Sequence, residues 1–262
     1  MKIITFLTDF GTKSGYVAQM KGVASSITDA KLIDIDHEIS PQNVREGAFV
    51  LLTTVSYFPV GTVHVAVIDP GVGTNRRNLL IATKTHVLIG PDNGLLIPTA
   101  HFLGNFIVYE ITNKKYMLNT ISNTFHGRDI FTPVAAHIIN GVPFEKFGNP
   151  INDFIDLDLG KPIIEKSSAT GKIIHIDKFG NIITNIDGIN LRKVLDFDKK
   201  IMIFIGQKQK EIPFLKSYAY IRKNSYLATI GSSNFFEIGI NQGNAAKKLD
   251  VKIDDDIKIL FT

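Results

Sequence analysis

The hydrophobic pattern of the chain changes near residue 160, and this change is the strongest constraint on its fold. Before that point, β-rich apolar runs alternate with stretches of helical periodicity. After it, the apolar segments are short, rich in β-branched residues and separated by turns. Alternating strands and helices predict parallel βαβ units, whereas short turn-separated strands predict an all-β domain. We therefore expect an α/β domain with a mostly parallel sheet at residues 1–160 and a smaller all-β domain, a barrel or a sandwich, at residues 161–262.

The individual elements follow from the same patterns. In the first domain we expect strands at 2–7, 31–35 and 62–68, a hairpin at 79–82 and 86–89, and helices at 16–27, 43–57 and 129–139. In the second domain we expect strands at 172–176, 181–186, 200–205, 217–221, 226–231, 235–240 and 250–261.

Composition excludes several kinds of chemistry. The 262 residues include no cysteine, which removes disulfides, cysteine-ligated zinc and a thiol nucleophile. The formal net charge of +4 comes from lysines scattered among acidic residues, so a basic surface is a simpler interpretation than nucleic-acid binding. No apolar stretch approaches 18 residues and the N-terminus does not resemble a signal peptide, so we expect a cytoplasmic protein. The histidines show no metal-ligand spacing, so no metal is predicted.

Four apolar strands of the first half each end in an aspartate. In open α/β sheets, ligands bind beyond the carboxyl ends of the strands, so carboxylates placed there are candidates for a site. Aspartate also starts turns and caps helices, and that explanation is favoured for any single one of them. For Asp9 and Asp69, each followed by a glycine-containing turn, the two explanations are equally good. The four residues are Asp9, Asp36, Asp69 and Asp92.

The segment from Asp69 to Arg77 is the most informative loop. A glycine-containing turn leaves a strand and returns two arginines near a carboxylate. It lacks the Gly-Lys-Ser/Thr ending of a phosphate loop, and no helical pattern follows it, so nucleoside triphosphate binding is not predicted. The pair of Asp69 and Arg76 can be a plain ion pair, or a carboxylate whose charge and position are set by a fixed cation.

Other candidate motifs are spread along the rest of the chain. His126 stands beside a glycine just before a helical segment, a setting that none of the other histidines shares. In the second domain, the stretch 177–181 closes one strand and opens the next, which is good turn chemistry but also offers an aromatic face and polar side chains. The stretches 231–237 and 241–246 are small, polar and glycine-containing, and so permit backbone approach to a ligand.

Taken together, these motifs resemble one family. Thr8–Gly11, Asp69–Gly73, Phe125–Asp129, Phe179–Asn181 and Asn244–Ala246 occur in this order across nearly the whole chain. The set resembles the S-adenosylmethionine (SAM) hydroxide adenosyltransferases, also called SAM hydrolases, which are related to fluorinases and chlorinases. Each motif is weak alone, whereas the ordered set is specific.

The resemblance implies a fold, an assembly and a reaction. It implies an α/β domain, a β domain and a homotrimer whose sites lie between the N-terminal domain of one subunit and the C-terminal domain of the next. The implied reaction converts SAM and water into adenosine and methionine, with no cofactor. By resemblance, the catalytic residues are Asp69, Arg76 and His126, and Asp9 holds the ribose. The implied substrate-binding set is Asp9, Asn93, Asp177, Phe179, Asn181, Ser232, Glu237 and Ala245.

The residues suit this chemistry. A sulfonium leaves as a neutral thioether, so the enzyme has mainly to present an oxygen nucleophile in line at the ribose C5′. Asp69 can orient and deprotonate water, Arg76 can hold the developing hydroxide, and His126 can fix or relay the proton.

Three alternatives remain open. Halide can replace water, although halogenating relatives carry an extra loop in the first domain, which is absent here, and lack this Asp/Arg/His set. The chain can also bind SAM or adenosine without catalysis, with Asp69 and Arg76 as a structural pair. An RNA-binding module has no supporting motif.

Overall fold

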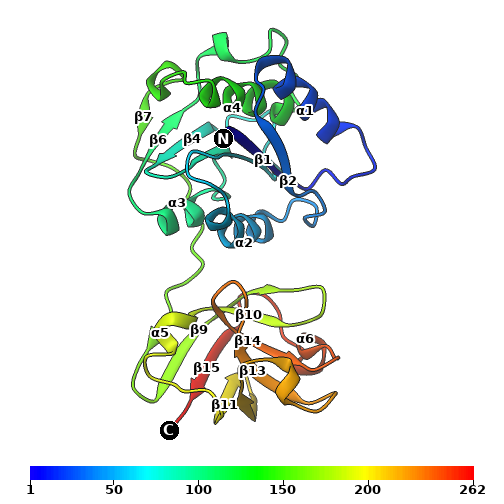
Figure 1. Cartoon of the computed structure of the whole chain (residues 1–262), viewed down its shortest axis with the longest axis vertical. Coiled ribbons are helices and arrows are strands. Elements are labelled where there is room, and N and C mark those ends of the chain that lie inside the picture. Colours follow the sequence, from blue (N-terminus) through cyan, green and yellow to red (C-terminus); the bar gives the residue numbers. More distant parts are fainter. The chain divides into compact units, whose positions relative to one another are not determined.

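The computed structural model describes residues 1–262, which form two compact units, Met1–Asp158 and Leu159–Thr262. Figure 1 shows the first unit in blue to green and the second in yellow-green to red. The first is an α/β unit and the second is a β-barrel, so the predicted fold class is confirmed. No helix has the length and apolar character that crossing a membrane requires.

The N-terminal unit is built on a seven-stranded sheet with the order β2-β1-β3-β5-β4-β6-β7. Strands β2, β1, β3 and β5 are parallel, as predicted, and β4, β6 and β7 continue the sheet in antiparallel pairings. The strands are β1 (Ile3–Thr8), β2 (Lys31–Asp36), β3 (Val63–Val67), β4 (Asn78–Thr83), β5 (Val87–Pro91), β6 (Phe106–Glu110) and β7 (Pro150–Ile151).

Helices cover both faces of this sheet (Figure 1). α1 and α4 share one buried cluster with the sheet, and α2 and α3 share another on the opposite face. The helices are α1 (Tyr16–Ile27), α2 (Val44–Thr54), α3 (Ile97–Leu103) and α4 (Thr132–Ile139). A single π-helical turn, Gly127–Phe131, precedes α4, and 3₁₀ turns lie at Val55–Tyr57, Lys114–Tyr116 and Phe144–Lys146.

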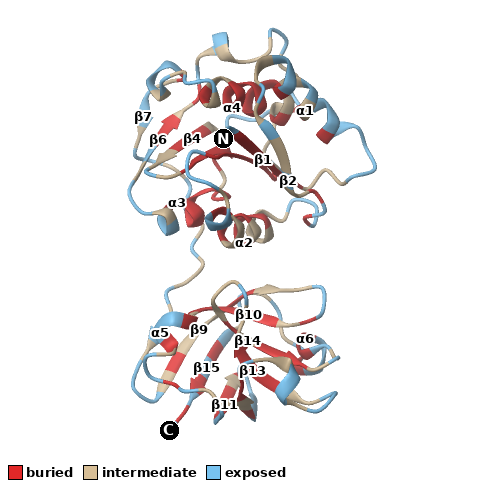
Figure 2. Cartoon of the chain, in the orientation of Figure 1, coloured by how far each residue is buried: buried red, intermediate tan, exposed pale blue.

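The central strands are buried on both faces. In β3, Val63, Val65 and Val67 pack into the cluster with α1 and α4, whereas Ala66 and the following Ile68 pack into the cluster with α2 and α3. Figure 2 shows this as a buried sheet between its helices, of which α1 and α2 are buried in part and α4 is buried at nearly every position. A strand buried on both faces leaves its carboxyl end as the place where polar groups can meet a ligand.

The C-terminal unit is a closed barrel. Its sheet runs in the order β10-β14-β13-β12-β11-β15-β9-β8, and β10 also pairs with β9, which closes seven strands on themselves. This closure decides for a barrel over a sandwich. The strands are β8 (Ile163–Ile164), β9 (Ser168–Ile176), β10 (Ile182–Asp187), β11 (Lys199–Ile205), β12 (Lys208–Phe214), β13 (Tyr226–Ile230), β14 (Phe235–Ile240) and β15 (Asp256–Leu260), with the short helices α5 (Gly188–Leu191) and α6 (Ala245–Leu249).

Two predicted strands of this unit are wrong in part or in full. Residues 217–221 form a 3₁₀ turn at Tyr218–Tyr220, because the Ser217 hydroxyl accepts a hydrogen bond from the Ala219 N–H and caps the turn. In 250–261 only Asp256–Leu260 is a strand, because Asp250 and Asp254 have positive φ and turn the chain before it.

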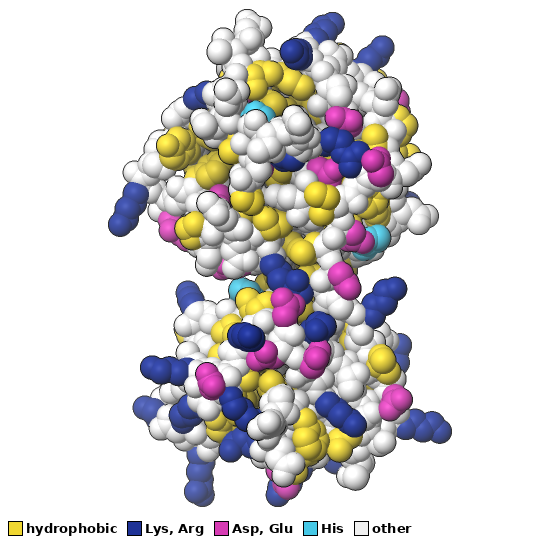
Figure 3. Space-filling model, turned by 180° about the vertical axis from the view of Figure 1, so that it is seen from behind, with side chains coloured by type: hydrophobic (Ala, Val, Ile, Leu, Met, Phe, Trp, Pro, Cys, Tyr) yellow, Lys and Arg dark blue, Asp and Glu magenta, His cyan; other side chains and the backbone are white.

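Charge is unevenly divided between the two units. Residues 159–262 contain 17 Lys and Arg against 11 Asp and Glu, whereas residues 1–158 contain 12 against 14. Figure 3 shows basic side chains projecting at many places from the visible face of the barrel unit, with acidic side chains between them. The surplus positive charge of the chain is therefore a property of the barrel surface.

Candidate active site

Asp69 and Arg76 form a buried pair at the carboxyl end of β3. Their side chains are 4% and 8% exposed. The Arg76 Nε–H is shared between the two carboxylate oxygens, at 2.9 Å from Oδ1 and 3.0 Å from Oδ2, and Nη2 lies 2.5 Å from Oδ2. The chain therefore holds this carboxylate in a fork, which fixes its direction.

The remaining donors of Arg76 are also in use. Nη2 lies 2.8 Å from Nδ1 of His126, and Nη1 donates to Oδ1 of Asn78 at 2.5 Å and to the carbonyl of Arg77 at 3.2 Å. A guanidinium has five N–H groups, and all five have an acceptor here. Arg76 therefore positions Asp69 and His126 but has no spare donor for a further ligand.

His126 is held as a neutral imidazole. Burial lowers its pKa below the ordinary value, and the positive charge of Arg76 lowers it further. Arg76 can only donate, so Nδ1 of His126 must accept through its lone pair.

Close packing joins the loops that carry these residues. Gly73 has φ +78°, and a Cβ there would lie 2.2 Å from the carbonyl oxygen of Asn123, in the segment that leads to His126. On the other side, the Asn93 Nδ2 donates to the Ile68 carbonyl at 2.8 Å, directly before Asp69. In this chain Asn93 therefore secures the strand end on which Asp69 stands.

Asp9 lies at the end of the neighbouring strand β1. Its Oδ2 accepts a hydrogen bond from the Gln42 N–H at 2.8 Å. The next residue, Phe10, meets Phe125 edge to face with ring centroids 5.6 Å apart. The loop of Asp9 therefore packs beside the segment of His126. This agrees with the expectation that the loops at the carboxyl ends of parallel strands lie together.

Asp92, the remaining buried aspartate at a strand end, has a structural part. Its Oδ2 accepts from the Arg77 Nε at 2.9 Å, and its Oδ1 accepts from the Ile155 N–H at 2.8 Å. It anchors the segment that follows β7, and its side chain has no hydrogen bond with Asp69, Arg76 or His126.

In the barrel unit, Asp177 organises its own loop. Its Oδ1 accepts the backbone N–H groups of Phe179 and Asn181, both at 2.9 Å, and its Oδ2 accepts the Asn181 side-chain amide at 2.9 Å. The ring of Phe179 is left 65% exposed. The Asp-to-Asn stretch is therefore a turn, and the turn presents an open aromatic face.

This loop packs against the start of α6. The Ala246 N–H donates to the Gly180 carbonyl at 2.9 Å, and Gly180, with φ +81°, has no room for a Cβ beside the Asn244 side chain. The fully buried Ala245 lies in the same contact. Two of the predicted motifs, distant in sequence, thus meet in one place.

A cavity of about 550 Å³ opens at this junction, lined by Phe179, Asn181, Tyr218, Ile240, Asn241, Gln242, Gly243 and Asn244. Tyr218 donates to Glu237 Oε1 at 2.6 Å. Burial raises the pKa of Glu237, and the negative charge of Asp177 raises it further. Of the predicted residues, Phe179 and Asn181 line the cavity, Glu237 touches its lining through Tyr218, and Ser232 lies in the turn between β13 and β14 outside the lining.

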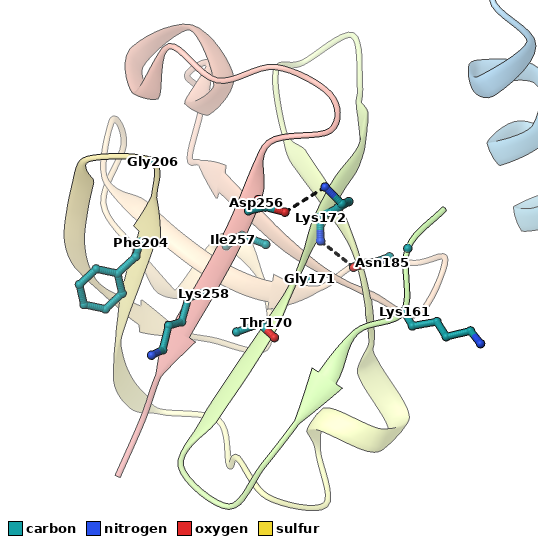
Figure 4. A pocket seen from close by; sticks show the side chains of 11 residues that line it. Lys161, Thr170, Gly171, Lys172, Asn185, Phe204, Gly206, Asp256, Ile257 and Lys258 are labelled. Atoms are coloured by element: carbon teal, nitrogen blue, oxygen red, sulfur yellow. Dashed lines mark hydrogen bonds and ion pairs between the residues drawn. The ribbon is translucent and has the colours of Figure 1, made fainter. Parts of the chain in front are cut away.

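A second cavity, of about 430 Å³, lies on the barrel wall at β9, β11 and β15 and contains none of the predicted residues (Figure 4). Two of its polar side chains already have partners. Lys172 Nζ lies 3.0 Å from Asp256, and Asn185 Oδ1 accepts the Lys172 N–H at 2.8 Å. No group of three or more His, Cys, Asp or Glu side chains could hold a metal ion.

Sequence reasoning missed three contributors. Asn78 accepts a hydrogen bond from Arg76, Ser122 donates its backbone N–H to Asp129 in the segment before His126, and Tyr218 lines the cavity and donates a hydrogen bond to Glu237. Asn78 and Ser122 belong to no motif, and Tyr218 lay in a segment predicted as a strand. Only the approach of distant segments in the fold gives these residues a part.

The fold and the clusters define a class: an α/β unit with a buried Asp–Arg–His cluster at its strand ends, followed by a closed β-barrel with an aromatic-lined cavity. Residues 4–148 match the SAM hydroxide adenosyltransferase N-terminal domain, and residues 171–258 match the C-terminal domain of the same family. The chain belongs to the SAM hydroxide adenosyltransferase family, which confirms the predicted resemblance.

Relatives support this assignment over the full length. The chain is 40% identical to the (R)-S-adenosyl-L-methionine hydrolase of Methanocaldococcus jannaschii, across 100% of this chain and 97% of the relative. It is 27% identical to a fluorinase of an Actinoplanes species, across 86% of this chain and 89% of that enzyme. A crystal structure of an uncharacterized conserved protein from Thermotoga maritima superposes with a TM-score of 0.92 at 38% identity, covering 98% of this chain and 99% of that one.

Proposed function

We propose that this protein hydrolyses S-adenosyl-L-methionine to adenosine and L-methionine. Relatives named as (R)-SAM hydrolases match nearly the whole chain at 31–40% identity, above the 27% of the fluorinase. Their name specifies the R configuration at sulfur, and we extend that preference to this chain. The observation that carries the proposal is the buried cluster of Asp69, Arg76 and His126.

The reaction is a displacement at carbon. The oxygen of water attacks C5′ of the ribose, the C5′–S bond breaks, and its electron pair stays on sulfur, which becomes the neutral thioether of methionine. The water proton that is lost passes to a base and then to solvent. An acid at sulfur is unnecessary, because the sulfonium leaves as a neutral group.

Asp69 is the residue placed to receive the water. Its Oδ1 accepts only the Arg76 Nε–H, so lone-pair directions remain open for an O–H of water. Oriented water next to a fixed carboxylate needs little reorganisation on the way to the transition state.

Arg76 and His126 act by holding this carboxylate. All five N–H groups of Arg76 are bound within the protein, which disfavours the predicted contact of Arg76 with a developing hydroxide. His126 accepts from Arg76 at Nδ1, which favours its predicted fixing role over a proton relay. The fork on Asp69 keeps the carboxylate aimed in one direction.

The barrel residues suit the two ends of the substrate. The exposed ring of Phe179 offers a stacking face for adenine. Burial raises the pKa of Glu237 and the negative charge of Asp177 raises it further, so a cation bound near both carboxylates would stabilise their ionised forms. The ammonium group of the methionine part is such a cation. We place Asp9 at the ribose hydroxyls, Asn93 behind Asp69, and Asn181, Ser232 and Ala245 around the nucleoside.

The family resemblance also supports a homotrimer in the cytoplasm, with each site formed by the N-terminal unit of one subunit and the barrel of the next. The N-terminal unit has the reacting cluster, and the barrel has the aromatic cavity. This division between units supports a shared site.

The test is product analysis in labelled water. The purified protein is incubated with (R)-SAM or (S)-SAM in H₂¹⁸O, and the products are separated by chromatography with mass detection. We expect adenosine carrying ¹⁸O at the 5′-hydroxyl, formed faster from the R epimer. Unlabelled adenosine would contradict attack of water at C5′.

Two further arms decide between the alternatives. Repeating the incubation with chloride or fluoride should leave adenosine as the product, and a dominant 5′-halo-nucleoside would assign the chain to the halogenases instead. Asp69→Ala should abolish hydrolysis in a folded protein. If the wild-type protein bound SAM but did not turn it over, a non-catalytic binding protein would be favoured.

A further inference from the structure

The turn that carries Asp9 is held by a buried histidine that has no part in the mechanism above. His37 is 5% exposed and directly follows β2, the strand that pairs with β1. Its Nδ1 lies 2.8 Å from the hydroxyl oxygen of Thr8, a fully buried residue that precedes Asp9 in the chain. The same oxygen accepts the Phe10 N–H at 3.2 Å. The imidazole therefore fixes the hydroxyl that joins the two chain neighbours of Asp9.

The backbone of His37 holds the far side of the same turn. The Gly11 N–H donates to the His37 carbonyl at 2.7 Å, and Gly11 has φ +68°, in the region that favours glycine. One hydrogen bond from His37 thus reaches the chain before Asp9, and another reaches the chain after Phe10. A single buried residue sets the course of the backbone through Asp9.

The local structure of β2 brings His37 to this place. The register of β1 and β2 shifts by one residue at Ile35, which has no partner on β1. An extra residue of this kind bends a strand and changes the direction of the side chains that follow it. The other ring nitrogen, Nε2, lies 3.0 Å from Oδ1 of Asp34 but has no well-aimed hydrogen bond. The directed hydrogen bond of the ring is therefore the one to Thr8.

This turn leaves one oxygen of Asp9 open. Oδ2 accepts the Gln42 N–H at 2.8 Å, whereas Oδ1 accepts no hydrogen bond from the protein. An acceptor that is fixed on one side and free on the other suits a ribose hydroxyl, which donates. Because the ring of His37 is buried, it can act on a ligand only through the turn.

We propose, resting on the proposed function, that His37 is a positioning residue for the nucleoside: its hydrogen bonds to Thr8 and Gly11 direct the free oxygen of Asp9 toward the ribose hydroxyls. Loss of the ring would leave the buried Thr8 hydroxyl without its partner, and the hydroxyl would turn to another one and release the Phe10 N–H. Asp9 would keep its charge but lose its direction, so nucleoside binding would weaken.

Two amides at position 37 separate this role from simple packing. In His37→Asn the amide takes the place of Nδ1 and can still bond to Thr8. In His37→Gln the same amide is one carbon further out, near the place of Nε2, so Thr8 loses its partner. In calorimetric titration of the full-length protein with adenosine, we expect the Kd to rise about 10-fold in His37→Gln and to stay within about 3-fold in His37→Asn. Equal Kd values for the two variants would overturn the proposal.

A double-mutant cycle ties the effect to Asp9. Asp9→Ala should itself raise the Kd for adenosine, because it removes the acceptor for the ribose. If His37 acts through that carboxylate, adding His37→Gln to Asp9→Ala should change the Kd by less than about 2-fold. A further 10-fold rise in the double variant would mean that His37 acts elsewhere, and would overturn the proposal.

Strand β1 offers a matched control. Nδ1 of His64 lies 2.7 Å from the hydroxyl oxygen of Thr5, three residues before Thr8, and both partners are fully buried. His64→Gln thus removes an equivalent bond from the same strand at a place away from Asp9. We expect it to lower stability and to keep the Kd within about 3-fold of the wild type. A 10-fold rise in this control would overturn the specific role of His37.

Amide hydrogen exchange separates this inference from the proposed function, because it needs neither turnover nor ligand. The amides of Phe10 and Gly11 should exchange faster in His37→Gln than in the wild type, and His37→Asn and His64→Gln should keep the wild-type rates at these two positions. If the wild type neither hydrolysed SAM nor bound adenosine, the proposed function would fail, and exchange would still decide whether His37 holds the turn. Wild-type protection in His37→Gln would overturn the inference even in an active hydrolase. Should His37→Gln fail to fold, Thr8→Val removes the same hydroxyl and is read in the same way.

Discussion

At the scale of single residues, Arg76 differs from an ordinary surface arginine in having every donor occupied. It bridges the carboxylate of Asp69, the imidazole of His126 and the side chain of Asn78. Such a residue acts through geometry as well as charge. The single ammonium nitrogen of a lysine cannot reproduce the planar set of donors that a guanidinium presents. Sequence reasoning predicted the pair of Asp69 and Arg76 but not this saturation.

Arg76→Lys tests that difference, because it keeps the charge and removes the fork. We expect kcat for (R)-SAM to fall by about 100-fold or more, with a smaller change in KM, because Arg76 has no donor free for substrate. Arg77→Lys, on the same loop but bound to Asp92 and Asp153, is the control and should stay near wild-type kcat. Steady-state kinetics of both variants measure this difference. A nearly fully active Arg76→Lys protein would show that Arg76 contributes only its charge.

The buried pair of His64 and His86 makes a second residue-scale prediction, for stability. His64 is fully buried, its Nδ1 lies 2.7 Å from the Thr5 hydroxyl, and its ring is 5.3 Å from that of His86. Burial, with a contribution from His86, lowers the pKa of His64 from 6.5 to about 3. The unfolded chain therefore takes up a proton below pH 6.5 that the folded chain refuses, so stability falls as the pH drops toward 3.

Urea unfolding at pH 7.5 and pH 5.0 measures this effect. For each pH unit between the unfolded-state pKa of 6.5 and the folded-state pKa of about 3, the free energy of unfolding falls by about 1.4 kcal/mol. His64 should therefore contribute about 2 kcal/mol to the loss of stability between pH 7.5 and pH 5.0. His64→Phe should show a correspondingly smaller loss, whatever its stability at pH 7.5. Replacing the exposed His101 by Gln should leave the loss unchanged. An equal loss in wild type and His64→Phe would contradict the assignment.

At the scale of elements, the active cluster depends on two loops whose backbones touch. Gly73 has positive φ and lies so close to the Asn123 carbonyl that a Cβ would stand 2.2 Å away. Gly73→Ala should therefore separate the Asp69 loop from the His126 segment, lower kcat and cost about 1–3 kcal/mol of stability. Gly61→Ala has the matching backbone cost, with φ +89° and nothing within 4 Å, and should retain kcat. Equal kcat in the two variants would show that the loop contact is unimportant.

The elements also show what the sequence could predict. Helix α1 and strands β1 and β2 were predicted almost to the residue, because their hydrophobic period is unambiguous. Strand β12 was missed because its first four residues, Lys208–Glu211, are exposed and polar, and only its pairing with β11 makes it a strand. Local pattern predicts buried elements, whereas an exposed strand is determined by its neighbours.

The candidate site divides in the same way. Asp69, Arg76 and His126 were expected from their motifs, and they are in direct contact. Ser122 and Tyr218 could not be expected, since Ser122 acts through its backbone N–H, which has no side-chain signature, and Tyr218 stood in a segment predicted as a strand. Their importance arises from distances that only the folded chain sets.

At the scale of the whole molecule, the reacting cluster and the aromatic cavity belong to different compact units. If each proposed site joins the N-terminal unit of one subunit to the barrel of the next, a chain damaged in one unit can still supply an intact other half. A ring of subunits with head-to-tail interfaces makes this possible, since every subunit uses both of its halves with different neighbours.

Subunit mixing tests this arrangement. Asp69→Ala disables the half of the site on the N-terminal unit, and Asp177→Ala disables the half on the barrel. Each variant alone should be inactive on (R)-SAM. After the two are unfolded together in equal amounts and refolded, each site draws its halves independently, so about one site in four has both halves intact and about a quarter of wild-type activity should return. Refolded wild-type protein gives the reference, and each variant refolded alone gives the background. A mixture no more active than the single variants would mean that both halves come from one chain, because every chain in it has one lesion.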